Sequence, residues 1–503
     1  MTIYHMNKGI GRASSGIEYA QKYRFELVKE FPERQFFVFC DYLSTNITVY
    51  TDKMGFDPDY VLNAYKYMAG QKNHPSSYSA DDFAATIPSE FEKTDDTSQF
   101  VSYKSDKTHY KLWLLPENGM VDRIDTIFNG KLMTVDHYSD RLTSTDFYTG
   151  AAVTARHFYD ENGKLSMRQF YQDKAIALTL IDDLVLQGRN AFYQEFFKRL
   201  EFTADDLIIV DRNKEIGDAL YPNSGEAKVC VVIHAEHYNA ARTTDDWVGW
   251  NNFYEYPFVN PQWIDHFIVS TYKQEEILRE QMAKMGHPDV DVLTIPVGAI
   301  THISDGENVE KNKYKFMTAS RLAFEKHIDI SIKAVVAAKK VVPELEFHIY
   351  GDGKFRKDLA DLIKKYDASS YIILEGHKNL AEIYPQFGGY LTASGSEGFG
   401  LTILEAIAEM LPIVGLNVNY GNTEFVKSGV NGILIEKTDP KTQVKDMTAA
   451  IIKQVQTLDF AKNIAYSQEK AAQYTDVEVK KKWRALYDTV LFRGINTDNG
   501  GEA

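Results

Sequence analysis

Cysteine is scarce in this 503-residue sequence, with only Cys40 and Cys230 present. Both lie in apolar runs typical of strands, which indicates small buried core residues rather than metal ligands or a disulfide bridge. No apolar run approaches the ~18 residues that a membrane span needs, and the first ten residues lack the pattern of a secretion signal. A reducing, cytoplasmic location is therefore expected, with peripheral membrane contact left open.

The chain also lacks an excess of positive charge, because its formal net charge is −15. This charge works against nonspecific nucleic-acid binding, so any contact with phosphates must come from a few placed cations. The chain is well supplied with hydrophobic residues (44%) and aromatic residues (13%), enough for large cores. A chain of this length is expected to form two to four domains.

Alternating strand and helix patterns near both ends of the chain predict an α/β fold with two doubly wound sheets. The first series has strands at 2–6 and 35–39 around a helix that starts near Ser15, where Ser15 and Glu18 make an S-x-x-E capping box. This series resumes near residue 190. The second series starts after residue 300 and includes a helix between strands 371–374 and 389–393. Ligands of such sheets bind at the carboxyl ends of strands, so a cleft between the two sheets is expected.

Between the two halves of the first series, residues 46–185 show a different pattern. Short alternating segments rich in Tyr, Phe, Thr and Val are separated by Asn-Gly pairs at 118–119, 129–130 and 162–163, which favour tight hairpins. We predict an inserted antiparallel β-meander, with a helical or irregular part before about residue 95. The predicted division is 1–45 and 186–300 for the N-terminal Rossmann-like domain, 46–185 for the insertion, 301–475 for the C-terminal Rossmann-like domain, and 476–503 for a helix and tail.

The stretch 391–411 carries the most distinctive chemistry. An apolar run ends in a small-residue loop, Gly395 to Gly400, and then enters a helix with apolar residues at helical spacing. Glu397 lies in the loop, and Glu405 lies inside the helix, about two turns away from Glu397. The pair suits either the two carboxylates of a glycosidase or two groups that bind hydroxyls, and the spacing alone leaves both open.

Three further groups are candidates for phosphate or substrate binding. Arg321 and Lys326 follow a strand end, where a guanidinium and an ammonium suit a diphosphate, although solvated surface cations are the simpler interpretation. The loop 9–16 is only a weak dinucleotide signal, but it delivers a helix start that can face a phosphate. His234 ends strand 228–233 in the order H-A-E-H, which lacks zinc-helix spacing, so no metal site is predicted. The G-x-G turn at 351–353 is interpreted as a simple strand-to-helix turn.

Together these residues resemble a retaining glycosyltransferase of the GT-B fold, family 4. Its signature is the E-x7-E motif, here Glu397 to Glu405, joined by Arg321, Lys326 and the glycine-rich N-terminal loop. Segments such as VVIHAEHY, SRLAFEKHID, GSEGFGLTILEA and VNYGN more closely resemble the catalytic subunit of the two-subunit enzymes that start O-glycosylation of serine-rich repeat adhesins in Gram-positive bacteria. This resemblance extends over essentially the whole chain.

The resemblance implies a donor site without a metal, in which a UDP-sugar is a substrate. It implies catalytic roles for Glu397, Arg321, Lys326 and His234; UDP contacts for Gly16, Ile17, Glu18, Tyr19, Arg321, Lys326, His377 and Glu405; and sugar contacts for His234, Glu397, Gly398, Phe399 and Gly400. Within this set Glu405 bonds the ribose and the region of His377 holds the uracil. The hydroxyl of a Ser or Thr acceptor attacks from the front face, and the leaving phosphate takes its proton.

The resemblance also implies a partner subunit, and two alternative functions stay open. The donor is expected to be UDP-N-acetylglucosamine, with UDP-glucose as the alternative, and the insertion is expected to bind an inactive glycosyltransferase-like subunit that holds the acceptor polypeptide. A wall teichoic acid glycosyltransferase is the nearest rival, but it should have a basic acceptor groove, whereas this chain offers only small clusters such as residues 480–482. A non-catalytic acceptor-binding module is the rival from another class. It would have no need of Arg321, Lys326, Glu397 and Glu405 together.

Overall fold

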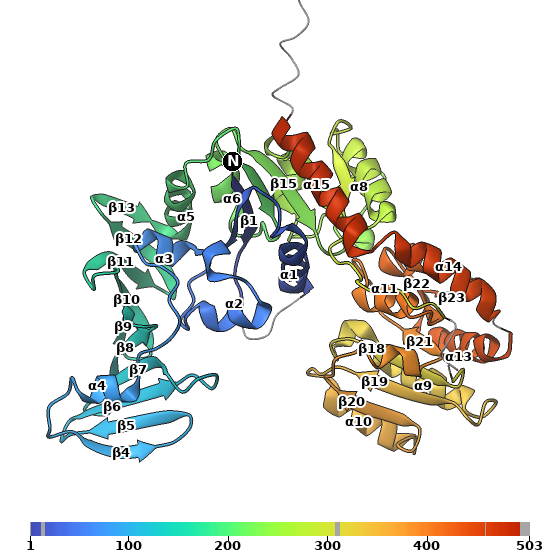
Figure 1. Cartoon of the computed structure of the whole chain (residues 1–503), viewed down its shortest axis with the longest axis horizontal. Coiled ribbons are helices and arrows are strands. Elements are labelled where there is room, and N and C mark those ends of the chain that lie inside the picture. The colour runs from blue at the N-terminus through green and yellow to red at the C-terminus, as the bar shows by residue number, and fades with distance from the viewer. Residues whose placement is uncertain (1, 12–15, 307–311, 458, 493–503) are drawn as a thin grey trace, which may run out of the picture. The chain divides into compact units, whose positions relative to one another are not determined.

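The computed structural model describes residues 2–11, 16–306, 312–457 and 459–492 (Figure 1). By contact the chain divides into two compact units. The first unit comprises Met1–Val232, Asn252–His266 and Thr489–Ala503, and the second comprises Ile233–Asn251 and Phe267–Asp488. Both cysteines are buried, as predicted; Cys230 lies within a strand and Cys40 directly follows one. Across the described part of the chain, none of the helices combines the length and apolar character that a bilayer crossing requires.

The first sheet has seven strands in the order β17-β16-β15-β14-β1-β2-β3. Strands β2, β1, β14 and β15 pair in parallel, so the predicted doubly wound pattern is confirmed here. The strands read as near-continuous apolar runs because both faces of a parallel sheet are covered. The strands are β1 Thr2–Asn7, β2 Arg34–Phe39, β3 Val61–Asn63, β14 Leu207–Val210, β15 Lys228–Ile233, β16 His266–Val269 and β17 Val292–Thr294; the longer helices of this part are α1 Gly16–Val28, α5 Gly188–Arg199 and α8 Tyr272–Lys284.

Strand β3 was not expected from the sequence, because it falls in the stretch assigned to the insertion. Val61 to Asn63 pair in parallel with Phe37 to Phe39 of β2. The first sheet therefore continues past residue 46. A three-residue strand carries no alternation that a sequence pattern can detect, and only the pairing with β2 defines it. Around it lie α2 Thr48–Met54, α3 Ala64–Met68 and α4 Ala80–Ala84, which confirms the helical part expected before residue 95.

The predicted β-meander is confirmed as a ten-stranded sheet in the order β13 to β4, with each strand antiparallel to its sequence neighbours. The glycines of the three Asn-Gly pairs have φ values of 74°, 73° and 74°, the left-handed conformation that the tight turns need. The strands are β4 Glu92–Asp96, β5 Phe100–Lys104, β6 Thr108–Leu114, β7 Val121–Phe128, β8 Lys131–Tyr138, β9 Leu142–Thr149, β10 Ala152–Tyr159, β11 Leu165–Gln172, β12 Ala175–Ile181 and β13 Leu184–Gln187.

A buried polar cluster joins this sheet to the first one. Arg156 of β10 is 3.4 Å from the ring centroid of Tyr42 and bonds Asp146 of β9 in a two-point ion pair. His137 of β8 lies 3.3 Å from the same carboxylate. Burial works to raise the pKa of Asp146, but the hydrogen bonds from His137 and Arg156 outweigh it and hold that pKa below its usual range. The carboxylate of Asp146 is therefore ionised, and it is held by Arg156 and His137 in this buried cluster.

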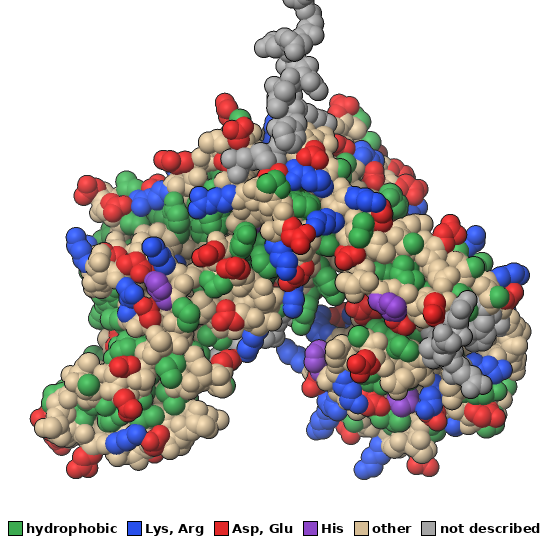
Figure 2. All heavy atoms as spheres, viewed as in Figure 1, with side chains coloured by type: hydrophobic (Ala, Val, Ile, Leu, Met, Phe, Trp, Pro, Cys, Tyr) green, Lys and Arg blue, Asp and Glu red, His purple; other side chains and the backbone are tan. Residues whose placement is uncertain are grey.

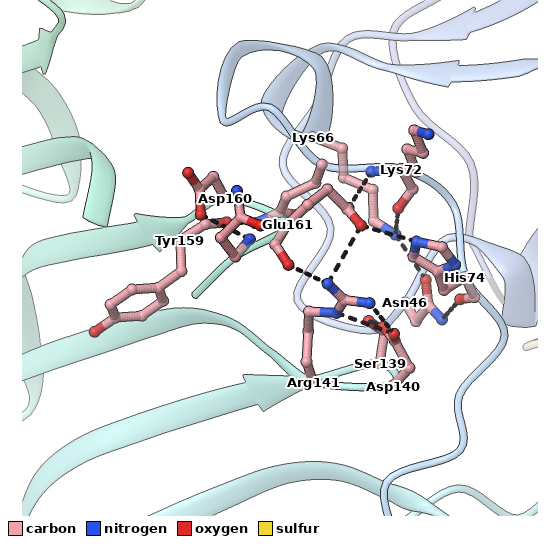
Figure 3. A network of polar contacts seen from close by, with 12 residues as sticks. Asn46, Lys66, Lys72, His74, Ser139, Asp140, Arg141, Tyr159, Asp160 and Glu161 are labelled. Carbon is pink, nitrogen blue, oxygen red and sulfur yellow. Dashed lines mark hydrogen bonds and ion pairs between the residues drawn. The ribbon is translucent and has the colours of Figure 1, made fainter. Parts of the chain in front are cut away.

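A second set of contacts fastens residues 71–78 onto the hairpin turns of the β-sheet (Figure 3). His74 Nε2 lies 3.0 Å from Glu161 Oε2, and Arg141 reaches the same oxygen at 3.3 Å. The backbone N–H of Lys72 donates to Glu161 Oε1 at 2.6 Å. Lys66 donates instead to Asn46 Oδ1 at 3.1 Å and to the carbonyl of Lys72 at 3.4 Å, and burial lowers its pKa to about 8. The insertion is thus held by specific polar contacts as well as by apolar packing.

The buried cluster around Asp146 leads to a prediction about stability. Asp146→Ala leaves the Arg156 guanidinium buried without its counter-ion, so the unfolding free energy of this part should fall by about 3–5 kcal/mol. Asp96→Ala is the matched control, because its pair with Lys93 is exposed and such pairs contribute only about 0–1 kcal/mol. Thermal unfolding of both variants checks this, and equal melting temperatures would contradict it. The carboxylate's contribution is present above its unfolded pKa and is lost as pH falls through the lower folded pKa.

The third sheet is parallel, with six strands in the order β20-β19-β18-β21-β22-β23. The helix predicted between strands β20 and β21 is wrong: residues 377–388 form turns and one short 3-10 segment, Tyr384–Gln386. The strands are β18 Lys315–Ala319, β19 Glu346–Tyr350, β20 Ile372–Gly376, β21 Gly389–Thr392, β22 Ile413–Asn417 and β23 Gly432–Glu436; the helices are α9 Ile328–Ala338, α10 Arg356–Lys365, α11 Leu401–Ala408, α12 Gly421–Phe425, α13 Pro440–Thr457, α14 Phe460–Ala472 and α15 Asp476–Phe492.

Candidate functional site

The loop between β21 and α11 is shaped by its glycines. Gly400 has φ of 84° and begins the turn into α11, a conformation that residues with a side chain rarely adopt. A β-carbon on Gly398 would lie 2.3 Å from the carbonyl oxygen of His234, so no side chain fits at position 398. Within the described residues, the backbone N–H groups from Gly398 to Thr402 donate to no backbone carbonyl. The start of α11 therefore presents a row of amide donors beside Glu397.

Glu397 and Lys326 form a close ion pair in this loop. Lys326 Nζ donates to Glu397 Oε1 at 2.6 Å, and the two side chains are 21% and 16% exposed. Tyr420 and Gly421 donate their backbone N–H groups to the carbonyl of Glu397 at 2.7 and 3.3 Å, which holds the loop backbone. The structure thus brings together two residues that lie 71 positions apart in the chain.

Glu405 lies in α11 and is largely buried. Tyr384 donates its hydroxyl to Glu405 Oε2 at 2.8 Å. Burial raises the pKa of Glu405, against a smaller opposing effect of this hydrogen bond. The side chain of Tyr384 is 2% exposed, so its hydroxyl is firmly placed against one of the two carboxylate oxygens.

Arg321 has a different setting, because its side chain is 72% exposed. It pairs with Glu325 at 2.6 Å, four residues along the chain. Exposed pairs of this kind contribute little to stability. The described position of Arg321 is thus that of an exposed cation whose ion pair with Glu325 would cost little to break.

The turn 351–353 explains how this cation-bearing loop is supported. A β-carbon on Gly351 would lie 1.9 Å from the carbonyl oxygen of Ser320, and one on Gly353 would lie 2.4 Å from that of Leu322. Both glycines are needed for this close approach of two backbones. The interpretation of the G-x-G segment as a structural turn therefore agrees with the geometry.

His234 follows β15, and the loop after it is fixed by His237, a residue that the sequence analysis did not select. His237 is fully buried, its Nε2 lies 2.9 Å from Gln281 Oε1, and its Nδ1 lies 3.1 Å from the hydroxyl of Tyr420. Burial lowers the pKa of His237 to about 4, so the imidazole is neutral. The only sequence signal for this role is the second histidine of H-A-E-H, which looks like any polar loop residue.

The structure places two further predicted ligand residues, Phe399 and His377, in different settings. The Phe399 side chain is 4% exposed and packs against Phe425 and Tyr474, with ring centroids 5.2 and 5.8 Å away, so any ligand contact comes from its backbone. The sequence could not show this, since a loop phenylalanine suits a core or a ligand equally well. His377 is exposed directly after β20, beside Gly376.

The N-terminal candidates lie in the other compact unit. Gly16 opens α1 at the surface and the Tyr19 side chain is 45% exposed. Glu18 is 4% exposed and accepts from Arg212 at 3.1 Å, so its carboxylate is committed to the protein interior. Ile17 is partly buried. The capping box rests on Ser15, which lies outside the described residues.

Metal-binding geometry is not found in the part of the chain that the structure describes. No group of three or more His, Cys, Asp or Glu side chains there is arranged to hold a metal ion. The positive charges on the described part of this loop include Lys326, the amide row at the start of α11 and Lys437, whose Nζ donates to the carbonyl of Gly395 at 2.7 Å. Arg321 is exposed after β18.

Comparison with known proteins defines the class first. Residues 300–469 match the family described as "Glycosyl transferases group 1", and residues 91–182 match the "GtfA extended beta-sheet domain". With two Rossmann-like sheets and the E-x7-E loop, the chain is a glycosyltransferase of the GT-B fold. The UDP-N-acetylglucosamine–peptide N-acetylglucosaminyltransferase GtfA subunit of Streptococcus pneumoniae serotype 4 is 37% identical over 503 residues, covering 98% of this chain and 100% of that protein. The chain therefore belongs to the GtfA subunit family.

Solved structures agree with this family. The pneumococcal O-GlcNAc transferase GtfA in complex with UDP and GlcNAc has a TM-score of 0.90 at 35% identity, covering 98% of this chain and 99% of that one. A chain of a GtfA/B complex has a TM-score of 0.92 at 32% identity, covering 98% and 100%. The poly(ribitol-phosphate) alpha-N-acetylglucosaminyltransferase of Staphylococcus aureus is only 22% identical over 409 residues, covering 78% of this chain and 77% of that protein. The teichoic acid enzymes are therefore distant relatives.

Proposed function

We propose that the chain transfers N-acetylglucosamine from UDP-N-acetylglucosamine to Ser or Thr of a serine-rich adhesin polypeptide, with retention at the sugar carbon. The observation that carries this proposal is the meeting of Lys326, Glu397 and the unused amides at the start of α11. The names of the pneumococcal relative and of its UDP and GlcNAc complex support the same donor. UDP-glucose is the alternative donor, since none of the residues described above distinguishes N-acetylglucosamine from glucose.

In this proposal each group has one task. Transfer places growing negative charge on the departing diphosphate, and Lys326, Arg321 and the α11 amides donate to that charge. They take the part that a metal ion plays in other transferases. Glu397 holds the sugar hydroxyls with the Gly398 to Gly400 backbone, and Glu405, placed by Tyr384, accepts from the ribose hydroxyls.

The remaining assignments concern both units. His234 lies near the transferred sugar or the acceptor, and His377 lies beside the uracil. The start of α1 at Gly16, with Ile17 and Tyr19, contacts UDP through its amides and its positive dipole end, while Glu18 contributes only its backbone. The cytoplasm, with possible peripheral contact at the inner membrane face, is the proposed location, since two buried cysteines suit a reducing compartment.

A product analysis tests this function against its rivals. The chain, co-purified with its partner subunit, is mixed with UDP-N-acetylglucosamine and a serine-rich peptide, and mass spectrometry should find one N-acetylhexosamine added per modified site. If instead a hexose is added, and only from UDP-glucose, the donor is UDP-glucose. Release of UDP that depends on teichoic acid and not on the peptide would favour the rival enzyme, and no release with any acceptor would favour a binding module.

We further propose that one face of the ten-stranded sheet binds the glycosyltransferase-like partner. The strand registers place Phe147, Ala155, Phe170 and Leu178 side by side on four adjacent strands, because Phe147 pairs with Ala155, Ala155 with Phe170 and Phe170 with Leu178. These four residues, here called the apolar stripe, are partly or fully exposed. Their strand neighbours Asp146, Arg156, Gln169 and Thr179 point to the other face and are buried.

The position of the stripe favours a protein partner. A ready-made apolar row on an open sheet face is typical of a docking surface. The opposite end of the same sheet is unlike it, since β4 is charged and every residue of β4 is exposed. Figure 2 shows acidic and basic side chains interspersed over the visible face, with no large patch of one sign. Apolar contact is therefore the specific feature that this sheet offers, and the name of the GtfA/B complex supports a partner for this family.

Phe170→Asp should abolish co-purification with the partner, because a carboxylate in the middle of the stripe would be desolvated without a counter-ion. Phe128→Asp is the matched control: it also puts a carboxylate on an exposed phenylalanine of the same sheet, but on β7 and away from the stripe. Size-exclusion chromatography of the co-expressed pair measures the result. If the Phe170 variant still elutes as a complex, or if both variants lose it equally, the stripe is not the docking surface.

A further inference from the structure

Two buried side chains, His237 and Tyr420, join the loop of His234 to the loop of Glu397. Both have 0% exposure, and the Tyr420 hydroxyl lies 3.1 Å from His237 Nδ1. Their rings also stack, with centroids 5.8 Å apart and planes inclined by 21°. Tyr420 belongs to the VNYGN segment 418–422, which has no part in the function proposed above.

The imidazole is set up to accept this hydrogen bond. Burial keeps His237 neutral, with a pKa of about 4, so one ring nitrogen carries a proton and the other does not. When Nδ1 accepts from Tyr420, Nε2 carries the proton and donates to Gln281 Oε1 at 2.9 Å. Gln274, also on α8, donates to the carbonyl of Ala235 at 2.9 Å and ties the same loop to that helix.

On its other side Tyr420 holds the Glu397 loop through the backbone. Its N–H donates to the carbonyl of Glu397 at 2.7 Å, and the N–H of Gly421 adds a second bond at 3.3 Å. A β-carbon on Gly421 would lie 2.1 Å from the carbonyl oxygen of Phe399. The segment 420–421 therefore lies directly against the loop that carries the proposed sugar ligands.

The two loops also touch each other directly. Gly398 packs on the backbone of His234 and Ala235 so closely that a β-carbon would lie 2.3 Å from one carbonyl oxygen and 3.2 Å from the other residue's Cα. Glu397 and Gly398 thus lie between residues 234–235 and residues 420–421. A shift of Tyr420 would move Glu397 relative to His234.

We propose that Tyr420 and His237 are positioning residues that set the separation of Glu397 and His234, and so the alignment of the donor sugar with the attacking acceptor hydroxyl. This proposal rests on the proposed function. Neither residue touches the substrate in it, and the nucleotide is held by other residues, among them Arg321, Lys326 and Glu405. Misplacement by about 1 Å costs on the order of 100-fold in rate without loss of binding.

The test is Tyr420→Phe, which removes the hydroxyl and keeps the ring. We expect kcat for transfer to a serine-rich peptide to fall roughly 10- to 100-fold, while the KM for UDP-N-acetylglucosamine and the Kd for UDP stay within about threefold. Tyr193→Phe is the matched control, because it also removes the hydroxyl of a fully buried tyrosine, which donates to Asp41 Oδ1 at 3.0 Å in the first unit. This control should keep its kcat.

A second pair of variants separates positioning from folding. His237→Asn keeps an amide oxygen near the Nδ1 position and should retain more kcat than His237→Leu, which has no acceptor. Wild-type kcat in Tyr420→Phe overturns the proposal. The proposal is also overturned if Tyr420→Phe and Tyr193→Phe lose kcat, UDP affinity and melting temperature to the same extent, since that result means a structural role alone. Absence of transfer by the wild-type complex would instead overturn the proposed function.

Discussion

Glu397→Gln is expected to lower kcat/KM for sugar transfer by roughly 10²- to 10³-fold. The substitution keeps the size of the side chain but removes the charge that Lys326 contacts at 2.6 Å. A neutral amide accepts weaker hydrogen bonds from the sugar hydroxyls, and it also leaves Lys326 without the carboxylate that orients it. The effect should appear mainly in kcat, since both the sugar and the Lys326 ammonium lose an alignment that matters most in the transition state.

The measurement is peptide-dependent release of UDP, with circular dichroism and thermal unfolding to show that the fold is intact. Glu382→Gln is the matched control, an exposed glutamate of the same unit away from the loop, and should behave as the wild type. Turnover of Glu397→Gln at the wild-type rate would refute the assignment of this carboxylate to the sugar.

Arg321→Ala is expected to have a comparable effect, with kcat/KM reduced by at least about 100-fold. The guanidinium is 72% exposed and its only described partner is Glu325, so it is available to grip two diphosphate oxygens when the donor binds. Arg321→Lys should recover only part of the activity, because an ammonium cannot form the two-point contact. The stability cost should be within about 0.5 kcal/mol, as for other exposed surface changes.

Lys333→Ala is the control for this prediction. Lys333 pairs with Asp329 at 2.7 Å, also four residues away, on helix α9 of the same unit. Its loss removes an equivalent charge without touching the loop at the end of β18. Steady-state kinetics with varied UDP-N-acetylglucosamine compares the three variants, and equal kinetics for Arg321→Ala and Lys333→Ala would show that Arg321 is only a surface cation.

The elements that the sequence predicted well are those with strong local periodicity. Apolar runs of four to six residues marked the central strands, and the Asn-Gly pairs marked hairpins whose glycines have positive φ. The helix predicted between β20 and β21 was wrong because an apolar spacing over residues 377–388 does not reveal turns and a 3-10 segment. Strand β3 was missed because its three residues are defined by pairing with β2.

The candidate site was predicted unevenly for a similar reason. Arg321, Lys326, Glu397 and Glu405 were selected from their order and spacing in the chain, and the structure places Lys326 against Glu397 and Tyr384 against Glu405. Phe399 faces the core, and Glu18 pairs with Arg212, so neither side chain is available to a ligand as the predicted site would require. Burial and pairing depend on distant residues, which a local pattern does not contain.

The sequence by itself determined the α/β class, the inserted β-meander and the identity of the charged residues in the E-x7-E loop, because periodicity, turn residues and motif spacing are local properties. Only the tertiary structure decided which of these residues meet. It placed Lys326 on Glu397, brought Gly398 against the backbone of His234, and joined His237 to Tyr420, 183 positions away. The physical reason is that such contacts arise from the packing of separate elements, and packing depends on the whole fold.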